Sequence, residues 1–182
     1  MSEELIIRHC SPTLAGMKAG SLFACEYPSE KQMNSEIGAI NKKLKSGGVR
    51  VLPVIRGNRA LVYIYRPKAL KKAFENAQAK EILKNTGYEG LESEKCVVKL
   101  MKKLRTNEEF PHEIGLFLGY PPEDVAGFMK NGAKKSKITG LWRVYGNEEA
   151  ANKIFAKYKK CSEVYLKEFK KGRTLEKLTV NF

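Results

Sequence analysis

Long apolar runs are missing from this chain. Its 182 residues contain no stretch approaching the roughly 20 apolar residues that a helix needs to cross a bilayer. The N-terminus, MSEELIIRHC, is acidic and lacks the basic segment, long apolar segment and cleavage site of a secretory signal. We therefore expect a cytoplasmic protein that makes no membrane contact.

Common catalytic and binding motifs are also absent. The chain has no GxxxxGK(S/T), no GxGxxG after a strand, no HExxH and no GxSxG, which argues against P-loop, Rossmann, zincin and serine-hydrolase sites. RRM, KH and C2H2 signatures are missing too. Two histidines exclude a metal site made of histidines alone. The four cysteines form no CxxC pair, so we expect free thiols at Cys10, Cys25, Cys96 and Cys161.

Acidic residues are scarce relative to basic ones, and the excess is uneven. The net charge is +14, and residues 31–90 contain thirteen basic against four acidic residues. Residues 133–182 contain thirteen against five, whereas the other segments are close to neutral. Such a surface attracts anions, including nucleic acid, nucleotides and acidic proteins.

The patterns that are present predict an α+β fold in a single domain spanning residues 1–182. Apolar fractions of 42% and charged fractions of 30% fit a globular chain. We expect a mixed sheet of about five or six strands, including a central hairpin, with helices packed on it. The predicted strands are 5–9, 21–27, 49–56, 59–66, 138–145 and 175–182. The predicted helices are 11–20, 31–45, 67–87, 92–105, 110–119, 121–132 and 147–171.

Two local signals refine this prediction. Gly57-Asn58 suits a two-residue hairpin turn, and Pro53 favours an edge position or a bulge for the first arm. Pro67 and Asn147 are typical of helix starts, the first at N1 and the second as a cap.

The first candidate site is His9, Cys10, Ser11 and Thr13, at a predicted junction of strand and helix. Free N–H groups and the positive dipole end at a helix start lower a thiol pKa and attract anions. Ser11 and Thr13 would add hydroxyl groups. In the alternative reading Ser11 is only a cap, Cys10 a small core residue and His9 a hydrogen-bonded neighbour.

The second candidate site is His112 with Glu113, again at a predicted helix start. A histidine beside a glutamate can act as an acid–base pair or bind a metal. Adjacent helical residues diverge by about 100°, so the alternative is a packed histidine and an exposed glutamate. If His9 and His112 converge, the set with Cys10 and Glu113 suits zinc or iron.

Tyr120 lies in a sharp turn between two predicted short helices and is a third candidate for a ligand pocket. Its alternative role is packing, as an aromatic ring at a turn.

Basic residues beside aromatics form a possible nucleic-acid surface. Lys134, Lys135 and Lys137 precede Trp142 and Arg143, a combination found on single-strand binding surfaces. On the following helix the spacing of Lys153, Lys157 and Lys160 places them in one stripe. The alternative is an ordinary solvated helix face.

Four segments resemble a small uncharacterised family found mainly in anaerobic bacteria. They are HCSPTLAGMKAGSLF, VLPVIRGNRALVYIYRP, FPHEIGLFLGYPPEDVAGF and GLWRVYGNEEAANKIFAKYKKC, and the HEIGLFLGYPPEDVAGF stretch is the most specific. The resemblance implies a stand-alone domain, but it carries over no catalytic residue because the family has no assigned activity. It also implies an association with flavodoxin-type electron transfer or iron handling.

Three functional hypotheses follow. The first is a binding or accessory protein whose pocket near His9, Cys10, His112 and Glu113 holds an anion, a metal or a redox cofactor. The second is a binder of nucleic acid or of an acidic protein such as a flavodoxin-like partner, through the basic surface. The third is a small enzyme with His112 as acid–base and Cys10 as nucleophile. The identity of any cofactor stays open.

Overall fold

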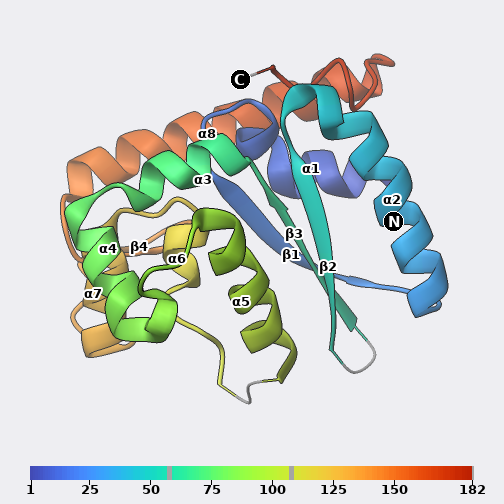
Figure 1. The fold of residues 1–182 in the computed structure, drawn as a ribbon. Coiled ribbons are helices and arrows are strands. Elements are labelled where there is room, and N and C mark those ends of the chain that lie inside the picture. The colour runs from blue at the N-terminus through green and yellow to red at the C-terminus, as the bar shows by residue number, and fades with distance from the viewer. Residues whose placement is uncertain (57–58, 107–108, 182) are drawn as a thin grey trace.

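A three-stranded antiparallel sheet lies between two groups of helices (Figure 1). The computed structural model describes residues 1–56, 59–106 and 109–181. The strands of the sheet are β1 Gly20–Glu26, β2 Arg50–Arg56 and β3 Arg59–Tyr65, in the order β1-β3-β2. A separate antiparallel pair consists of β4 Ile138–Thr139 and β5 Arg143–Val144. The helices are α1 Glu3–Leu14, α2 Glu30–Leu44, α3 Pro67–Phe74, α4 Ala77–Leu83, α5 Ser93–Thr106, α6 Ile114–Phe117, α7 Pro122–Asn131 and α8 Glu148–Lys170.

Alternating side chains of the sheet build two separate cores. On β3, Val62 and Ile64 face α1 and α2, whereas Tyr63 and Tyr65 face α3 to α7. Successive residues of a strand point to opposite faces, so each strand contributes to both cores. Residues that lie on opposite faces are thereby kept apart, and this decides which candidate site residues can meet.

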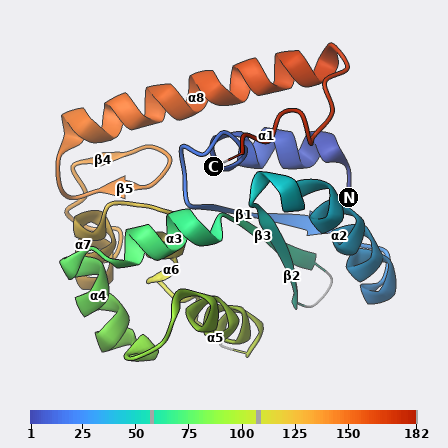
Figure 2. The same ribbon diagram turned by 45° about the horizontal axis from the view of Figure 1, so that its top comes forward.

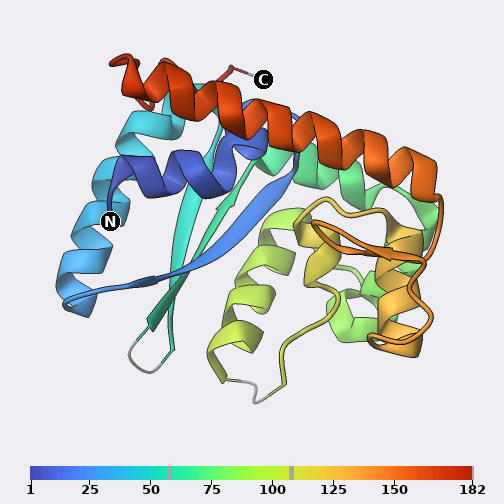
Figure 3. The same ribbon diagram turned by 180° about the vertical axis from the view of Figure 1, so that it is seen from behind.

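The long helix α8 crosses above both helix groups (Figure 2). Its second half contributes Phe169 and Leu166 to the core around α1. Its first half runs beside the β4–β5 hairpin (Figure 3). There Phe155 packs against Trp142. Among the described residues, no helix combines the length and the apolar character needed to cross a membrane.

Several sequence predictions are confirmed, beginning with the α+β class. The predicted helix 31–45 is α2, whose residues Met33, Ile37, Ile40 and Leu44 are all buried. The hairpin forms, and β2 with Pro53 is an edge strand, as the missing N–H requires. Pro67 opens α3, and the side chain of Asn147 caps α8 by accepting from the Ala150 N–H. The predicted turn at residues 57–58 lies outside the described residues.

The N-terminal prediction is wrong. Residues 5–9 belong to α1 rather than to a strand, and Ser11-Pro12 lies near the end of this helix, not at its start. Ser2 caps the helix by accepting from the Leu5 N–H, and Glu3 follows in the first turn, where the helix dipole favours a carboxylate. The apolar run within residues 5–9 is too short for its spacing to distinguish a helix from a strand. Burial against α8 and the sheet favours the helix.

The predicted mixed sheet of five or six strands is also wrong, since the described main sheet has three strands and is wholly antiparallel. Residues 138–145 fold back at Gly140 into the short β4–β5 hairpin. Residues 175–181 form turns that bury Leu175 and Leu178 instead of a strand, and residue 182 lies outside the described part. The predicted helix 67–87 breaks at Asn76, which caps α4.

A buried arginine joins these parts. Arg66 follows β3, is only 2% exposed, and its guanidinium donates hydrogen bonds to four backbone carbonyls. The acceptors are Thr13 O at 2.5 Å, Leu14 O at 2.6 Å, Gly47 O at 2.8 Å and Val180 O at 2.8 Å. Carbonyls at the end of a helix have no partner within that helix. Arg66 therefore satisfies the ends of α1 and of the turn after α2, and attaches the C-terminal segment to both.

We predict that Arg66→Met destabilises the fold by on the order of 3 kcal/mol, because several buried carbonyls lose a charged donor. Arg66→Lys should recover only part of this loss, since an ammonium group cannot reproduce the planar donors of a guanidinium. Urea unfolding measures both effects. Arg59→Lys, an exposed arginine on the same strand, is the matched control. Equal stability of Arg66→Lys and the unchanged protein would contradict this role.

Candidate functional site

Cys10 lies in the core and not at a helix start. Its side chain is 0% exposed among α1, α2 and one face of the sheet. Burial raises the pKa of the Cys10 thiol to about 12, although nearby Lys18 and a hydrogen bond with Ser21 act in the opposite direction. The thiol is therefore protonated at neutral pH, which argues against the nucleophile hypothesis.

The hydroxyl groups of Ser11 and Thr13 are fully buried and already bonded. Ser11 Oγ donates to the carbonyl of Ile7 one turn earlier, and Thr13 Oγ1 lies 2.8 Å from Ser21 Oγ. Because both residues lie near the C-terminal end of α1, no helix N-terminus is present there for an anion. The predicted helix start at Ser11 is therefore wrong, and the argument for an anion at a helix N-terminus does not apply there.

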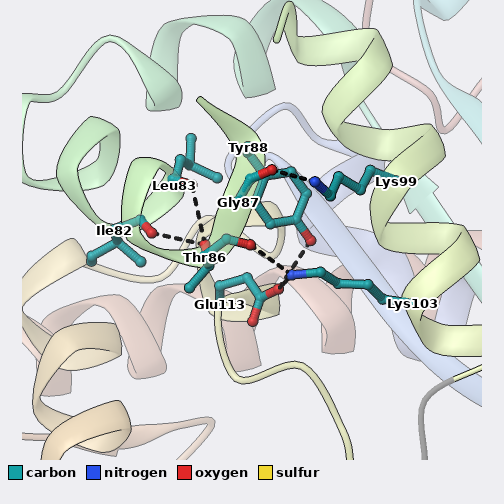
Figure 4. Close-up of polar contacts among 8 residues, drawn as sticks. All are labelled: Ile82, Leu83, Thr86, Gly87, Tyr88, Lys99, Lys103 and Glu113. Carbon is teal, nitrogen blue, oxygen red and sulfur yellow. Dashed lines mark hydrogen bonds and ion pairs between the residues drawn. The ribbon is translucent and has the colours of Figure 1, made fainter. Parts of the chain in front are cut away.

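Glu113 is buried on the opposite side of the sheet, in a network shown in Figure 4. Its Oε1 accepts from Tyr88 Oη at 3.0 Å and from Lys103 Nζ at 2.6 Å. Lys103 also donates to Thr86 O at 2.9 Å and lies 4.4 Å from the centre of the Tyr88 ring. Burial, followed by the charge of Glu113, raises the pKa of Tyr88. The network joins the turn before α5, α5 itself and the entry to α6, which is a structural role.

The two histidines do not share a site. His9 is exposed on α1 and stacks on Phe23 at 5.0 Å, and partial burial, followed by Arg8, lowers its pKa. His112 is exposed before α6, and its ring lies nearly perpendicular to the Phe128 ring, with the ring centres 4.9 Å apart. In the described residues no three His, Cys, Asp or Glu side chains are grouped closely enough to hold a metal ion. The zinc or iron set of His9, Cys10, His112 and Glu113 is therefore not assembled.

A cavity of about 690 Å³ opens beside His9, and we call it the Lys18 cavity. Helix α1, the turn before β1, β1 itself, the segment between α6 and α7, the β4–β5 hairpin and α8 all contribute to it. It is lined by Arg8, His9, Pro12, Lys18, Ser21, Leu22, Tyr120, Gly140, Leu141, Phe155, Ala156, Tyr158, Lys159 and Ser162. The volume falls within the range typical of small-molecule sites.

The ionisable side chains that line the Lys18 cavity are basic or phenolic, and no described lining residue is an aspartate or glutamate. Lys18 is half-buried, with Nζ 5.1 Å from the centre of the Tyr120 ring. Burial lowers the pKa of Lys18 to about 8, opposed by the neighbouring Cys10. Arg8 and Lys159 are exposed, and Arg8 also pairs with Glu4 at 2.8 Å. A desolvated lysine with a perturbed pKa in a cleft is a mark of functional sites.

Two contacts shape the wall of this cavity. Tyr158 Oη donates to Met17 O at 3.0 Å, which attaches the turn carrying Lys18 to α8. Gly140 lets the Phe155 ring approach closely, since a Cβ at this position would lie 2.2 Å from Phe155 Cε2. A side chain at residue 140 would therefore displace the aromatic wall.

Sequence reasoning missed Lys18, although the residue carries a signal. It is the only lysine among residues 1–30 and stands in an apolar stretch between Gly16 and Gly20. The sequence predicts a helix over residues 11–20, whereas α1 ends at Leu14 and the following turn places the Lys18 amine 5.1 Å from the centre of the Tyr120 ring.

The candidate basic surface is partly engaged in the fold. Trp142 is buried and donates from Nε1 to Asp124 Oδ2 at 2.7 Å, so its ring is not free to stack on bases. Lys137 donates to Gly146 O, and Lys153 pairs with Glu149. Arg143 is half-buried, and the remaining candidates are exposed, namely Lys134, Lys135, Lys157 and Lys160.

Comparison with known proteins gives one result. A family model described as "Protein of unknown function (DUF3793)" matches residues 6–179. No curated protein and no solved structure matches the chain. The expectation of an uncharacterised family is thereby confirmed, whereas its bacterial distribution and its defining motif stay predictions. Because the match extends from α1 past α8, the chain belongs to the DUF3793 family.

Proposed function

We propose that this protein binds a small organic anion in the Lys18 cavity. The observation that carries the proposal is the half-buried Lys18 amine, accompanied by Arg8, His9 and Lys159 in a cavity whose described lining has no carboxylate. A phosphate or carboxylate group near Lys18 would replace the hydration that the amine has lost.

The body of the ligand is expected to be flat or apolar. Tyr120, Phe155 and Tyr158 provide aromatic walls on one side of the cavity, and Leu141 adds an aliphatic side chain. Binding sites of this size commonly combine such walls with a few polar groups that fix orientation. An aromatic or nucleotide-like anion can pair with the basic side chains and also pack against the aromatic walls.

This proposal revises the hypothesis of a pocket near His9, Cys10, His112 and Glu113. His9 lines the Lys18 cavity, whereas Cys10 and Glu113 are buried in structural roles. The enzyme hypothesis loses its nucleophile, because the Cys10 thiol is buried and its pKa is raised. We also propose that the chain is one domain, since Arg66 links residues 13, 47 and 180.

Phenyl phosphate is a suitable first probe, because it combines a ring with a dianion. We predict that Lys18→Met weakens its binding by about tenfold or more, the effect of removing a charged hydrogen-bond donor. Isothermal titration calorimetry measures the change. Lys157→Met removes the same charge from the exposed face of α8 and should bind normally. Equal affinities in the two variants would refute the proposal.

The lowered pKa of Lys18 predicts that the stability of the fold depends on pH. Its pKa falls from 10.5 in the unfolded chain to about 8 in the fold, so the folded state binds fewer protons between these values. Keeping Lys18 charged in the fold therefore lowers the free energy of unfolding most below pH 8. This destabilisation disappears as the pH rises to 10.5. Without ligand, Lys18→Met should melt at a higher temperature than the unchanged protein at pH 7.

That difference in melting temperature should shrink between pH 8 and 10.5. Thermal unfolding of both proteins across this range measures it, with Lys157→Met as the control for a general loss of charge. A difference that does not change with pH would show that Lys18 has an ordinary pKa.

The basic-surface hypothesis stays a separate prediction. Lys134, Lys135, Lys157 and Lys160 are exposed, so binding of single-stranded nucleic acid or of an acidic flavodoxin-like protein through them should weaken steeply with salt. Fluorescence anisotropy at 50 and about 200 mM salt tests this expectation. Replacing Lys157 and Lys160 by glutamine should lower the affinity, and an unchanged affinity would count against this surface.

A further inference from the structure

We propose that a second cavity, which shares Tyr120 with the Lys18 cavity, binds a small carboxylic acid with an apolar body. The cavity measures about 360 Å³ and lies between the segment before α6, α6, α7 and β5. We call it the Trp142 cavity. It is lined by Phe110, His112, Ile114, Gly115, Leu118, Tyr120, Asp124, Val125, Phe128, Trp142 and Arg143.

The interior of the Trp142 cavity is apolar. Ile114, Leu118 and Val125 are each less than a tenth exposed, and the Phe128 ring adds an aromatic side. A ligand that covers apolar surface of this kind lowers the free energy of the complex, provided that it brings no unpaired polar group. The body of the ligand should therefore be aliphatic or aromatic.

Fixed contacts hold the cavity wall in place. Asp124 Oδ2 accepts from Trp142 Nε1 at 2.7 Å, and its Oδ1 accepts from the N–H groups of Tyr145 and Gly146 at 2.7 and 2.8 Å. The indole also stacks on Tyr120, with ring centres 4.8 Å apart. Both oxygens of the one carboxylate in the described lining are thus occupied, and the indole is locked as a rigid wall.

Two polar side chains of the lining are accessible to solvent. His112 is exposed and Arg143 is half-buried, whereas the apolar lining behind them is buried. Arg143 Nη1 has two long hydrogen bonds, each of 3.4 Å, to Ala133 O and Thr139 Oγ1. A guanidinium has five N–H donors in a fork that matches a carboxylate. The position of Arg143 at the rim of an apolar cavity therefore favours one anionic group on an apolar body.

This inference does not depend on ligand binding in the Lys18 cavity. The two cavities share Tyr120 but no charged side chain, because Lys18 lines one and Arg143 the other. The expected ligand bodies also differ, since a straight aliphatic chain suits the Trp142 cavity and a flat aromatic anion suits the Lys18 cavity.

The protein carries its own reporter for this site, because Trp142 is the only tryptophan of the chain. Straight-chain carboxylates from about four to ten carbons should change its fluorescence. Affinity should rise about fourfold per added methylene until the chain outgrows the cavity. The matched alcohols should bind about tenfold or more weakly, because they lack the charge that Arg143 recognises. Affinities that do not depend on chain length, or a preference for alkylammonium ions, would overturn the proposal.

Two variants locate the site. Arg143→Met should reduce carboxylate affinity to that of the alcohol, while Arg59→Met, an exposed arginine on β3, should leave it unchanged. Lys18→Met should retain the full dependence on chain length. Loss of that dependence in Lys18→Met would assign the ligand to the Lys18 cavity and reject the second site.

Discussion

The guanidinium of Arg66 is the interaction on which the arrangement of the fold depends. It donates to carbonyls at the end of α1, in the turn after α2 and near the C-terminus. The backbone N–H of the same residue donates to Ala19 O at 2.9 Å. Arg66 thereby holds the chain on both sides of Lys18, at residues 14 and 19. Tyr158 adds a third attachment at Met17, so a buried structural arginine places the candidate functional lysine.

The sheet decides which chemistry is possible by separating residues. Strand side chains alternate between its faces, and the sheet therefore separates the core that contains Cys10 from the core beside Glu113. Cys10 is also inaccessible to solvent, and the Glu113 carboxylate already accepts hydrogen bonds from Tyr88 and Lys103. His9, Cys10, His112 and Glu113 therefore do not come together as a set in the part of the chain that the structure describes.

Two cavities with different linings share Tyr120, whose ring stacks on Trp142 in the wall of the apolar cavity. On one side Lys18 and its basic neighbours favour an anionic group, and on the other an apolar interior favours a hydrocarbon body. Asp124 stabilises the wall of the Trp142 cavity by fixing the indole and the chain after β5. Among the described lining residues, Tyr120 alone belongs to both cavities.

The sequence by itself determined the elements whose signals are local. The apolar spacing of residues 31–45 and 92–105, the hairpin with Pro53 on its edge strand, Pro67 at a helix start and the Asn147 cap each depend on neighbours a few residues away. Only the tertiary structure decided that residues 5–9 are helical, that 175–181 form no strand and that Lys18 lines a cavity. The partners in those cases are contributed by α8, the sheet and Arg66, far away in the chain, and local periodicity contains no information about such distant contacts.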